Sequence, residues 1–447
     1  MADRILVSRS RHQSAKEKEI ELAYDEIAAG VTTTYLLDRV TYLAPVNFTE
    51  AAGAARHRWF PYKEGFSPAF VRDTLKRFMP ARRAGLVLDP FAGVGTTVLE
   101  AARIGHNGVG LDVSPLACFV ASTKSLQASD QTIRDIRRDL KELAGNSLSA
   151  IAPLPQNETV VSYFEPEYLE AILKIKAFAN SRRNSDSAAL FKLAFLGLIE
   201  RFSTHRKAGN GLKRKTRFRY RDQALGPLEQ VRAAAGVLVA SYLSDLEVTP
   251  LSGHGEIRNE SSLEANFGDT LFDCVLTSPP YANCFDYSKI YLCELWLGDF
   301  FESRKSQQLF RSNSVRSHVH ARWPARFAGK GSAIVDSLVA PLLSEQELWS
   351  TAIPEMISGY FSDLGQLLSR ISENLRQGAQ LGFVVSNSAY AGIPIATDLL
   401  ICEIATKVGY VPKEIIVYRK IIPSSQQFVK MADKNYLRES LVVLEKQ

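Results

Sequence analysis

Five consecutive residues, Thr277-Ser278-Pro279-Pro280-Tyr281, carry the groups needed to hold an amino group. The two prolines fix the backbone and remove two N–H donors, so the carbonyl groups around them act only as acceptors. Ser278 adds a hydroxyl group and Tyr281 adds a flat aromatic face. An exocyclic –NH₂ group needs two acceptors for its two hydrogens, and a nucleobase stacks well on an aromatic ring. The motif therefore indicates recognition of the amino group of a base.

A second motif, Asp89-Pro-Phe-Ala-Gly-Val-Gly-Thr-Thr97, contains two glycines separated by one residue. Glycine lets the backbone approach a ligand closely, and the N-terminus of a following helix favours a negative ligand group. Asp112 lies 17 residues beyond Gly95. An acid at that place can accept hydrogen bonds from both hydroxyl groups of a ribose. Together these features predict a nucleotide-like cofactor site.

The elements around the two motifs suit this interpretation. Leu86–Asp89 reads as a strand, Val98–Ile104 as a helix and Asn107–Asp112 as the next strand, which is a strand–helix–strand unit. The motif Thr277–Tyr281 directly follows the strand predicted at 273–277. Ligands of open α/β sheets bind at the carboxyl ends of the strands. We therefore expect cofactor and target to meet at the carboxyl ends of the first and fourth strands.

The positive charge of the chain is concentrated in two segments. The 447 residues carry a net charge of +6, yet Arg201–Arg221 holds nine lysines and arginines and Ser303–Lys330 holds seven, with no acid in either segment. The rest of the chain therefore carries −10. The first segment also contains aromatic residues and Gly209-Asn210-Gly211, a combination that suits a flexible loop for phosphate contact and base stacking. A solvated basic face is the alternative interpretation.

Composition excludes several classes of protein. With 46% hydrophobic and 23% charged residues, the chain is typical of a globular protein of two or three domains. No run of about 18 apolar residues and no secretory signal is visible. The five cysteines are scattered without a CxxC pair, which argues against a disulfide framework and a cysteine zinc site. We expect a cytoplasmic protein with no metal and no membrane partner.

At these motifs the chain resembles the S-adenosylmethionine-dependent DNA amino-methyltransferases, which methylate N4 of cytosine or N6 of adenine. Asp89–Thr97 resembles the cofactor loop of that family, and Thr277–Tyr281 resembles its catalytic motif in the SPPY form. Three weaker similarities support these two. Tyr62–Phe70 resembles the segment that closes over the methionine part of the cofactor, Asn266–Asp269 the third cofactor motif, and Leu375–Val385 the fifth strand region. The resemblance covers about 62–125, 255–300 and 355–447.

The resemblance implies S-adenosyl-L-methionine as cofactor and double-stranded DNA as partner. It implies catalytic roles for Ser278, Pro279, Pro280 and Tyr281. The implied cofactor-binding residues are Phe66, Ser67, Asp89, Pro90, Phe91, Gly93, Gly95, Thr96, Thr97, Asp112, Val113 and Asp269. In the family the last of these acids contacts the adenine amino group of the cofactor.

The residue types also define the reaction. Hydrogen bonds from the amino protons to Ser278 and the Pro279 carbonyl would localise the lone pair of the amino nitrogen, which then attacks the methyl group directly. A C5-cytosine enzyme would need a nucleophilic cysteine after a proline, and the sequence contains no Pro-Cys pair. The target base must leave the stack, and Tyr281 would stack on it. A serine at the first motif position favours N4 of cytosine, with N6 of adenine as the alternative. An RNA base methyltransferase and an inactive DNA-binding protein of the same fold remain further alternatives.

The resemblance implies an α/β fold with a Rossmann-like seven-stranded methyltransferase sheet, mostly parallel with the last strand antiparallel, and a helical insert lobe. The expected strands lie near 86–89, 108–111, 256–259, 273–277, 380–386, 413–419 and 439–444. The expected domains are a polar N-terminal segment (1–55) with a helix around 15–30, a discontinuous catalytic core (56–126 and 250–447), a helical insert (127–249) and a basic insertion (302–350). The insert and the basic insertion are candidates for target recognition.

The basic segments supply the candidate DNA contacts. These are Arg206, Lys207, Lys213, Arg214, Lys215, Arg217, Arg316, Arg322 and Arg326. A cognate restriction endonuclease is a possible partner, and binding to DNA would associate the protein with the nucleoid. Neither the recognition sequence nor the oligomeric state can be predicted from these residues.

Overall fold

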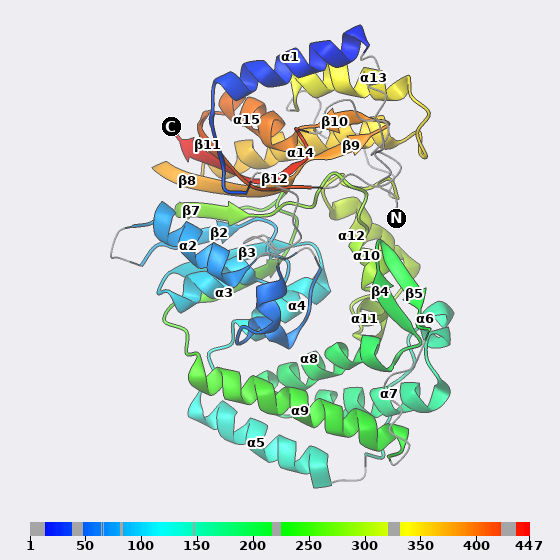
Figure 1. The fold of residues 1–447 in the computed structure, drawn as a ribbon. Coiled ribbons are helices and arrows are strands. Elements are labelled where there is room, and N and C mark those ends of the chain that lie inside the picture. The colour runs from blue at the N-terminus through cyan, green and yellow to red at the C-terminus, as the bar shows by residue number, and fades with distance from the viewer. Residues whose placement is uncertain are drawn as a thin grey trace, which may run out of the picture. The chain divides into compact units, whose positions relative to one another are not determined.

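The computed structural model describes residues 14–37, 48–63, 65, 67–80, 84–145, 148–216, 225–320, 331–421 and 435–447. The chain folds into two compact units. We call one the glycine-loop unit (residues 47–261 and 286–313) and the other the TSPPY unit (residues 1–46, 262–285 and 314–447). Figure 1 labels the elements of both units.

The glycine-loop unit contains three parallel strands in the order β2-β3-β6. Their bounds are Leu86–Asp89, Asn107–Asp112 and Gly255–Asn259. They are accompanied by the helices α2 (Pro68–Phe78), α3 (Thr96–Arg103) and α4 (Pro115–Lys124). Helices α2 and α4 begin in the same way: a serine caps each helix and a proline lies in its first turn. This is the strand–helix–strand unit that the sequence predicts.

A helical layer completes the glycine-loop unit (Figure 1), with α7, α8 and α9 packed against one another and α5 against α9. Its helices are α5 (Asp130–Gly145), α6 (Glu158–Ser162), α7 (Pro166–Asn180), α8 (Ser185–Phe202) and α9 (Pro227–Val248). A hairpin of β4 (His205–Ala208) and β5 (Gly211–Arg214) interrupts them. Residues 286–313 add α10 (Tyr287–Ile290), α11 (Leu292–Leu297) and α12 (Arg304–Asn313). The sequence predicts a helical insert at 127–249, which these helices form, but it predicts a flexible loop where the hairpin lies.

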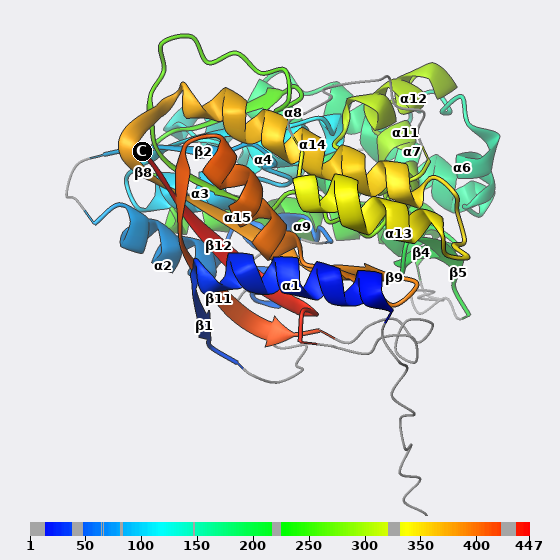
Figure 2. The ribbon, with the colours of Figure 1, turned by 90° about the horizontal axis from the view of Figure 1, so that it is seen from above.

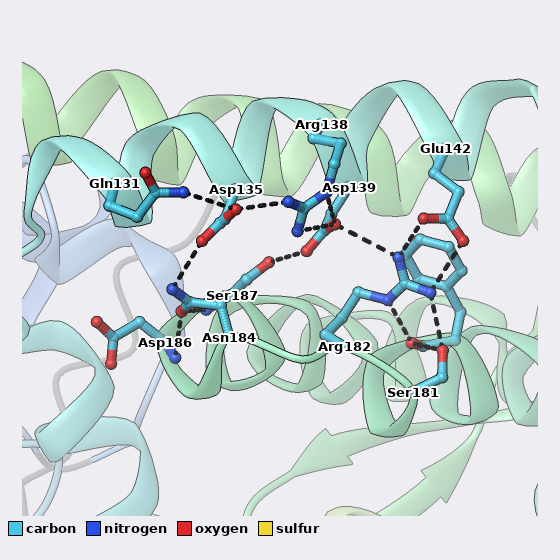
Figure 3. Close-up of polar contacts among 11 residues, drawn as sticks. Gln131, Asp135, Arg138, Asp139, Glu142, Ser181, Arg182, Asn184, Asp186 and Ser187 are labelled. Atoms are coloured by element: carbon cyan, nitrogen blue, oxygen red, sulfur yellow. Dashed lines mark hydrogen bonds and ion pairs between the residues drawn. The ribbon is translucent and has the colours of Figure 1, made fainter.

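Buried polar groups hold α5 to the α7–α8 corner (Figure 3). The carboxylate of Asp139, which is 2% exposed, accepts hydrogen bonds from Ser187 Oγ at 2.6 Å, from Arg138 Nε at 3.3 Å and from Arg182 Nη1 at 3.5 Å. Arg182 also pairs with Glu142 at 2.7 Å. Because Asp139 and Ser187 are buried between helices and the side chain of Arg182 is only 9% exposed, removal of Asp139 leaves buried polar atoms unsatisfied.

The Asp139→Ala variant is expected to lower the free energy of unfolding by about 3 kcal/mol, because Ser187 and Arg182 lose a buried acceptor. Chemical denaturation measures the change. Glu142→Ala is the control, because this carboxylate is 38% exposed and its pair with Arg182 should contribute less than about 1 kcal/mol. Equal losses in the two variants would contradict the structural role of Asp139.

The TSPPY unit contains five strands in the order β1-β11-β12-β8-β7. Their bounds, in chain order, are Thr32–Tyr35, Phe272–Thr277, Leu375–Ser386, Tyr410–Lys420 and Arg438–Lys446. Strand β7 is parallel to β8, whereas β12 runs antiparallel to both of its neighbours. A small hairpin of β9 (Ser388–Tyr390) and β10 (Ile393–Ile395) follows β8.

Helices α1 (Ala15–Ala29), α14 (Ile353–Ser372) and α15 (Thr397–Lys407) form one layer over these strands (Figure 2), with α13 (Ala340–Ser344) beside α14. The apolar faces of α14 and α15 are almost fully buried, which makes this layer the core of the unit.

The expected fold class is confirmed. All seven predicted strands are present, and β12 is the antiparallel one. The structure adds an eighth strand, β1, which pairs in parallel with β11 and which the sequence did not reveal. The helix expected around 15–30 is α1. Among the helices that the structure describes, none is long and apolar enough to span a membrane.

Candidate functional site

The glycine loop turns sharply at the end of β2. Asp89 is buried and its Oδ1 accepts a hydrogen bond from the Phe91 amide at 3.1 Å. Gly93 and Gly95 adopt positive φ angles of 51° and 79°, and a Cβ atom on Gly95 would lie 2.8 Å from Cβ of Ala121 in α4. The loop therefore requires glycine both for its conformation and for its closeness to α4.

Asp112 at the end of β3 closes the other side of the loop. Its two carboxylate oxygens accept hydrogen bonds from the amides of Gly93 at 2.9 Å and Ser114 at 2.7 Å. Burial raises the pKa of Asp112 to about 6, although these two amides act in the opposite direction. Each oxygen retains a second lone pair, so the carboxylate can also accept hydrogen bonds from ligand hydroxyl groups.

Three tyrosines form a wall beside this loop. The ring of Tyr62 stacks on Tyr291 with centroids 4.7 Å apart and on Tyr287 at 5.9 Å. Tyr62 Cε1 lies 3.7 Å from the point where a Cβ on Gly93 would stand, and the Lys63 amide donates to the Tyr291 hydroxyl at 2.8 Å. Burial raises the pKa of Tyr62 well above its usual value, so the ring is neutral. Sequence reasoning identified the segment that contains Tyr62 but missed the tyrosine wall.

The end of β6 adds two residues that sequence reasoning also missed. Asn259 donates from Nδ2 to the Asp112 carbonyl at 2.9 Å. The next residue, Glu260, has one buried carboxylate oxygen without a hydrogen-bond donor in the described part of the chain; Arg258 lies 3.9 Å away as an ion pair. A buried carboxylate oxygen of this kind can accept an N–H group from a ligand. The usable signal was position, because Asn259 ends a predicted strand and Glu260 follows it.

The remaining predicted cofactor residues divide by position. Pro90 is buried directly after β2, and Thr96 and Thr97 are buried at the start of α3, whereas Phe91 and Val113 are half-buried. Ser67 caps α2 and donates its hydroxyl proton to Glu50. Phe66 lies outside the described residues. Asp269 is exposed and precedes β7, at the end of that strand opposite to Ser278, so its cofactor contact stays a prediction.

In the TSPPY unit the motif leaves the carboxyl end of β7. The Ser278 hydroxyl donates its proton to the Val384 carbonyl in β8 at 3.1 Å. Its oxygen therefore keeps its lone pairs for donors from a ligand. The Tyr281 hydroxyl donates to Glu439 Oε1 at 3.3 Å, and Arg419 binds the other oxygen of that carboxylate at 2.6 Å. These contacts leave the serine oxygen as an acceptor and anchor the hydroxyl end of the tyrosine.

The predicted DNA contacts divide into two groups. Arg206, Lys213 and Arg214 are exposed on the β4–β5 hairpin. Lys207 forms ion pairs with Glu200 and Glu294, Lys215 donates to carbonyl groups at the end of α8, and Arg316 pairs with Asp363 at 2.7 Å. These three side chains have internal partners, so a DNA role for them stays a prediction. Arg217, Arg322 and Arg326 lie outside the described residues.

No protein-family model matches the chain. The chain is 27% identical over 440 residues to the type II methyltransferase M.BsoBI of Geobacillus stearothermophilus, with 87% of this chain and 85% of the relative covered. It is 26% identical over 435 residues to the type II methyltransferase M.AvaI of Anabaena variabilis, with 90% and 88% covered.

Among solved structures, the rRNA methyltransferase aviRa from Streptomyces viridochromogenes is 12% identical, with a TM-score of 0.31 and 89% and 92% of the two chains covered. This structural similarity is too weak to carry an argument. The similarity to the type II enzymes, in contrast, extends over most of both chains. It confirms the resemblance seen in the motifs: the protein is an S-adenosylmethionine-dependent methyltransferase related to the type II methyltransferases.

Proposed function

We propose that the protein transfers a methyl group from S-adenosylmethionine to the exocyclic N4 of cytosine at a specific site in duplex DNA. The observation that carries the proposal is the hydrogen bond from Ser278 Oγ to the Val384 carbonyl at 3.1 Å. Because the hydroxyl proton is directed to Val384, the oxygen can act only as an acceptor toward a ligand. That is the role that an amino-methyltransferase needs.

Ser278 and the Pro279 carbonyl would accept the two amino hydrogens of the base. The amino nitrogen of cytosine is a poor nucleophile, because its lone pair is delocalised into the ring. Two acceptors at its hydrogens favour tetrahedral geometry and localise that lone pair. When bound, S-adenosylmethionine supplies an electrophilic methyl group, which the nitrogen accepts as the carbon–sulfur bond breaks and a proton leaves to water.

The residues of the glycine-loop unit fit this cofactor. Gly93 and Gly95 give the backbone room for close approach, and Asp112 provides acceptors for the ribose hydroxyl groups. The flat, neutral face of Tyr62 suits the adenosine part, and the buried oxygen of Glu260 suits an amino group. Together these groups match the polar and aromatic groups of a nucleoside.

The choice of N4 of cytosine rests on the SPPY form of the motif. The hydrogen bond from the Tyr281 hydroxyl to Glu439, whose other oxygen is bound by Arg419, anchors the tip of the ring that would stack on the base. A base inside the duplex cannot reach such a ring, so the target nucleotide must be flipped out of the stack. N6 of adenine is the alternative target. A cognate restriction endonuclease would share the recognition site.

Mapping modified bases in the DNA of a bacterial host that lacks its own DNA methyltransferases tests the proposal. Expression of the protein should introduce N4-methylcytosine at one sequence motif. Detection of N6-methyladenine in place of N4-methylcytosine would show that the alternative target, adenine, is the methylated base. Unmodified DNA from a host whose purified enzyme binds S-adenosylmethionine would overturn the proposal.

The affinity for S-adenosylmethionine is expected to fall as the pH drops through about 6. The ribose hydroxyl groups donate to the ionised carboxylate of Asp112, and burial raises its pKa to about 6. Between pH 7 and pH 5 the ionised fraction falls about tenfold, so Kd should rise about tenfold. Calorimetric titration measures this change. The Asp112→Asn variant should bind weakly without this pH dependence, whereas a pH-independent Kd in the wild type would contradict the assignment.

A further inference from the structure

The β4–β5 hairpin has two faces with different surroundings. Cross-strand pairs join Arg206 to Lys213 and Lys207 to Leu212, and a two-residue turn, Gly209–Asn210, connects the strands. Because side chains alternate along a strand, Lys207 and Leu212 share one face while Arg206 and Lys213 share the other. Lys207 is 10% exposed, whereas Arg206, Lys213 and the turn are exposed.

The face with Lys207 anchors the hairpin to the body of the glycine-loop unit. Lys207 Nζ is bound by Glu200 of α8 at 2.9 Å and by Glu294 of α11. Its ammonium group also lies 5.0 Å from the centre of the Tyr291 ring. At the far end, Lys215 Nζ donates to the carbonyls of Glu200 at 2.5 Å and Ser203 at 2.8 Å. The hairpin is thus fixed to the glycine-loop unit through Lys207 and Lys215.

The outer face carries like charges directly opposite each other. Arg206 and Lys213 are register partners on neighbouring strands, and like charges in that position destabilise a ribbon. No acid lies anywhere in the hairpin or its turn. An anionic partner would convert this repulsion into attraction, and the polyanion of the proposed reaction is DNA.

The tip of the ribbon lies next to the residues around the cofactor loop. The Gly209 carbonyl accepts a hydrogen bond from Lys63 Nζ at 3.4 Å. The preceding residue, Tyr62, stands against Gly93 of the cofactor loop. A target base must be delivered to this neighbourhood, so DNA that is methylated there passes close to the ribbon.

We infer that the β4–β5 hairpin enters the major groove of duplex DNA and reads bases beside the target base. The inference rests on the proposed function. The major groove admits a two-stranded ribbon, and arginine recognises guanine there through two hydrogen bonds. Arg206 and Asn210 are the reading side chains, whereas Lys213 neutralises phosphates. Lys207 and Lys215 position the ribbon without touching DNA.

The test compares the sequence motif methylated in host DNA by the wild type and by Arg206→Gln, alone and with Lys213→Gln. Loss of Arg206 should lower the preference for the correct base at one position of the motif by roughly tenfold. Loss of Lys213 should weaken binding to a motif-containing duplex at all sequences and reduce its salt slope by about 1. Both residues are exposed, so the variants should melt and bind S-adenosylmethionine as the wild type does.

The control is the double variant Lys141→Gln and Arg183→Gln, which removes the same charge from exposed positions on α5 and after α7 of the same unit. It should leave the motif unchanged. An unaltered motif in Arg206→Gln would overturn the inference. An equal loss of sequence discrimination in the control would also overturn it, because it would show that overall charge, and not the hairpin, determines the effect. If the wild type methylates no DNA, the proposed function fails first and the inference fails with it.

Discussion

The Ser278→Ala variant is expected to lose about 100-fold in kcat while its affinity for S-adenosylmethionine stays within twofold of the wild type. The hydroxyl oxygen accepts an amino proton whose partial charge grows as the nitrogen gives up its lone pair. This hydrogen bond therefore strengthens in the transition state, and its loss appears in kcat more than in KM. Single-turnover methyl transfer and calorimetric titration of the cofactor measure the two quantities separately.

A structural role for Ser278 predicts a different outcome. The variant also leaves the Val384 carbonyl without the serine proton, which costs about 1 kcal/mol of stability. That loss is visible in the melting temperature and too small to deplete the folded enzyme. Ser344→Ala removes an exposed serine from α13 of the same unit and should change none of the three measurements. Parallel losses of turnover and cofactor affinity in Ser278→Ala would show that the serine merely supports the fold.

The local parts of this structure could be predicted from the sequence. A strand that ends in Asp89, a turn that only glycine permits and a helix start that follows it are all determined within about ten residues. The same holds for Ser278 and Tyr281, because the prolines between them define the backbone. Their positions therefore follow from steric rules, which do not depend on distant contacts.

The parts that the sequence did not reveal depend on distant partners. Lys207 belongs to a run of positive charge, yet Glu294 and Glu200 bind it internally. The tyrosine wall joins Tyr62 to Tyr291, 229 positions apart in the chain. Strand β1 has only four residues and pairs with β11 near the other end of the chain. In each case the decisive energy comes from tertiary packing, which local propensity does not report.

The Gly95→Ala variant is expected to weaken S-adenosylmethionine binding by about 100-fold, or roughly 2.7 kcal/mol. An alanine at a φ of 79° costs about 1–2 kcal/mol. Its Cβ would also stand 2.8 Å from Cβ and 3.2 Å from Cα of Ala121, so the loop or α4 must move. Such crowding costs about 1–3 kcal/mol, and the loop relieves it by shifting its backbone away from the ligand position.

Gly105→Ala separates these two effects. Gly105 follows α3 in the same unit with a φ of 90°, but a Cβ there would meet no atom within 4 Å. The variant therefore has the same backbone strain without the crowding. It should lower the melting temperature and leave the Kd for S-adenosylmethionine within about twofold. If both variants weakened binding equally, general loosening of the glycine-loop unit, and not the close approach of Gly95 to α4, would set the affinity for the cofactor.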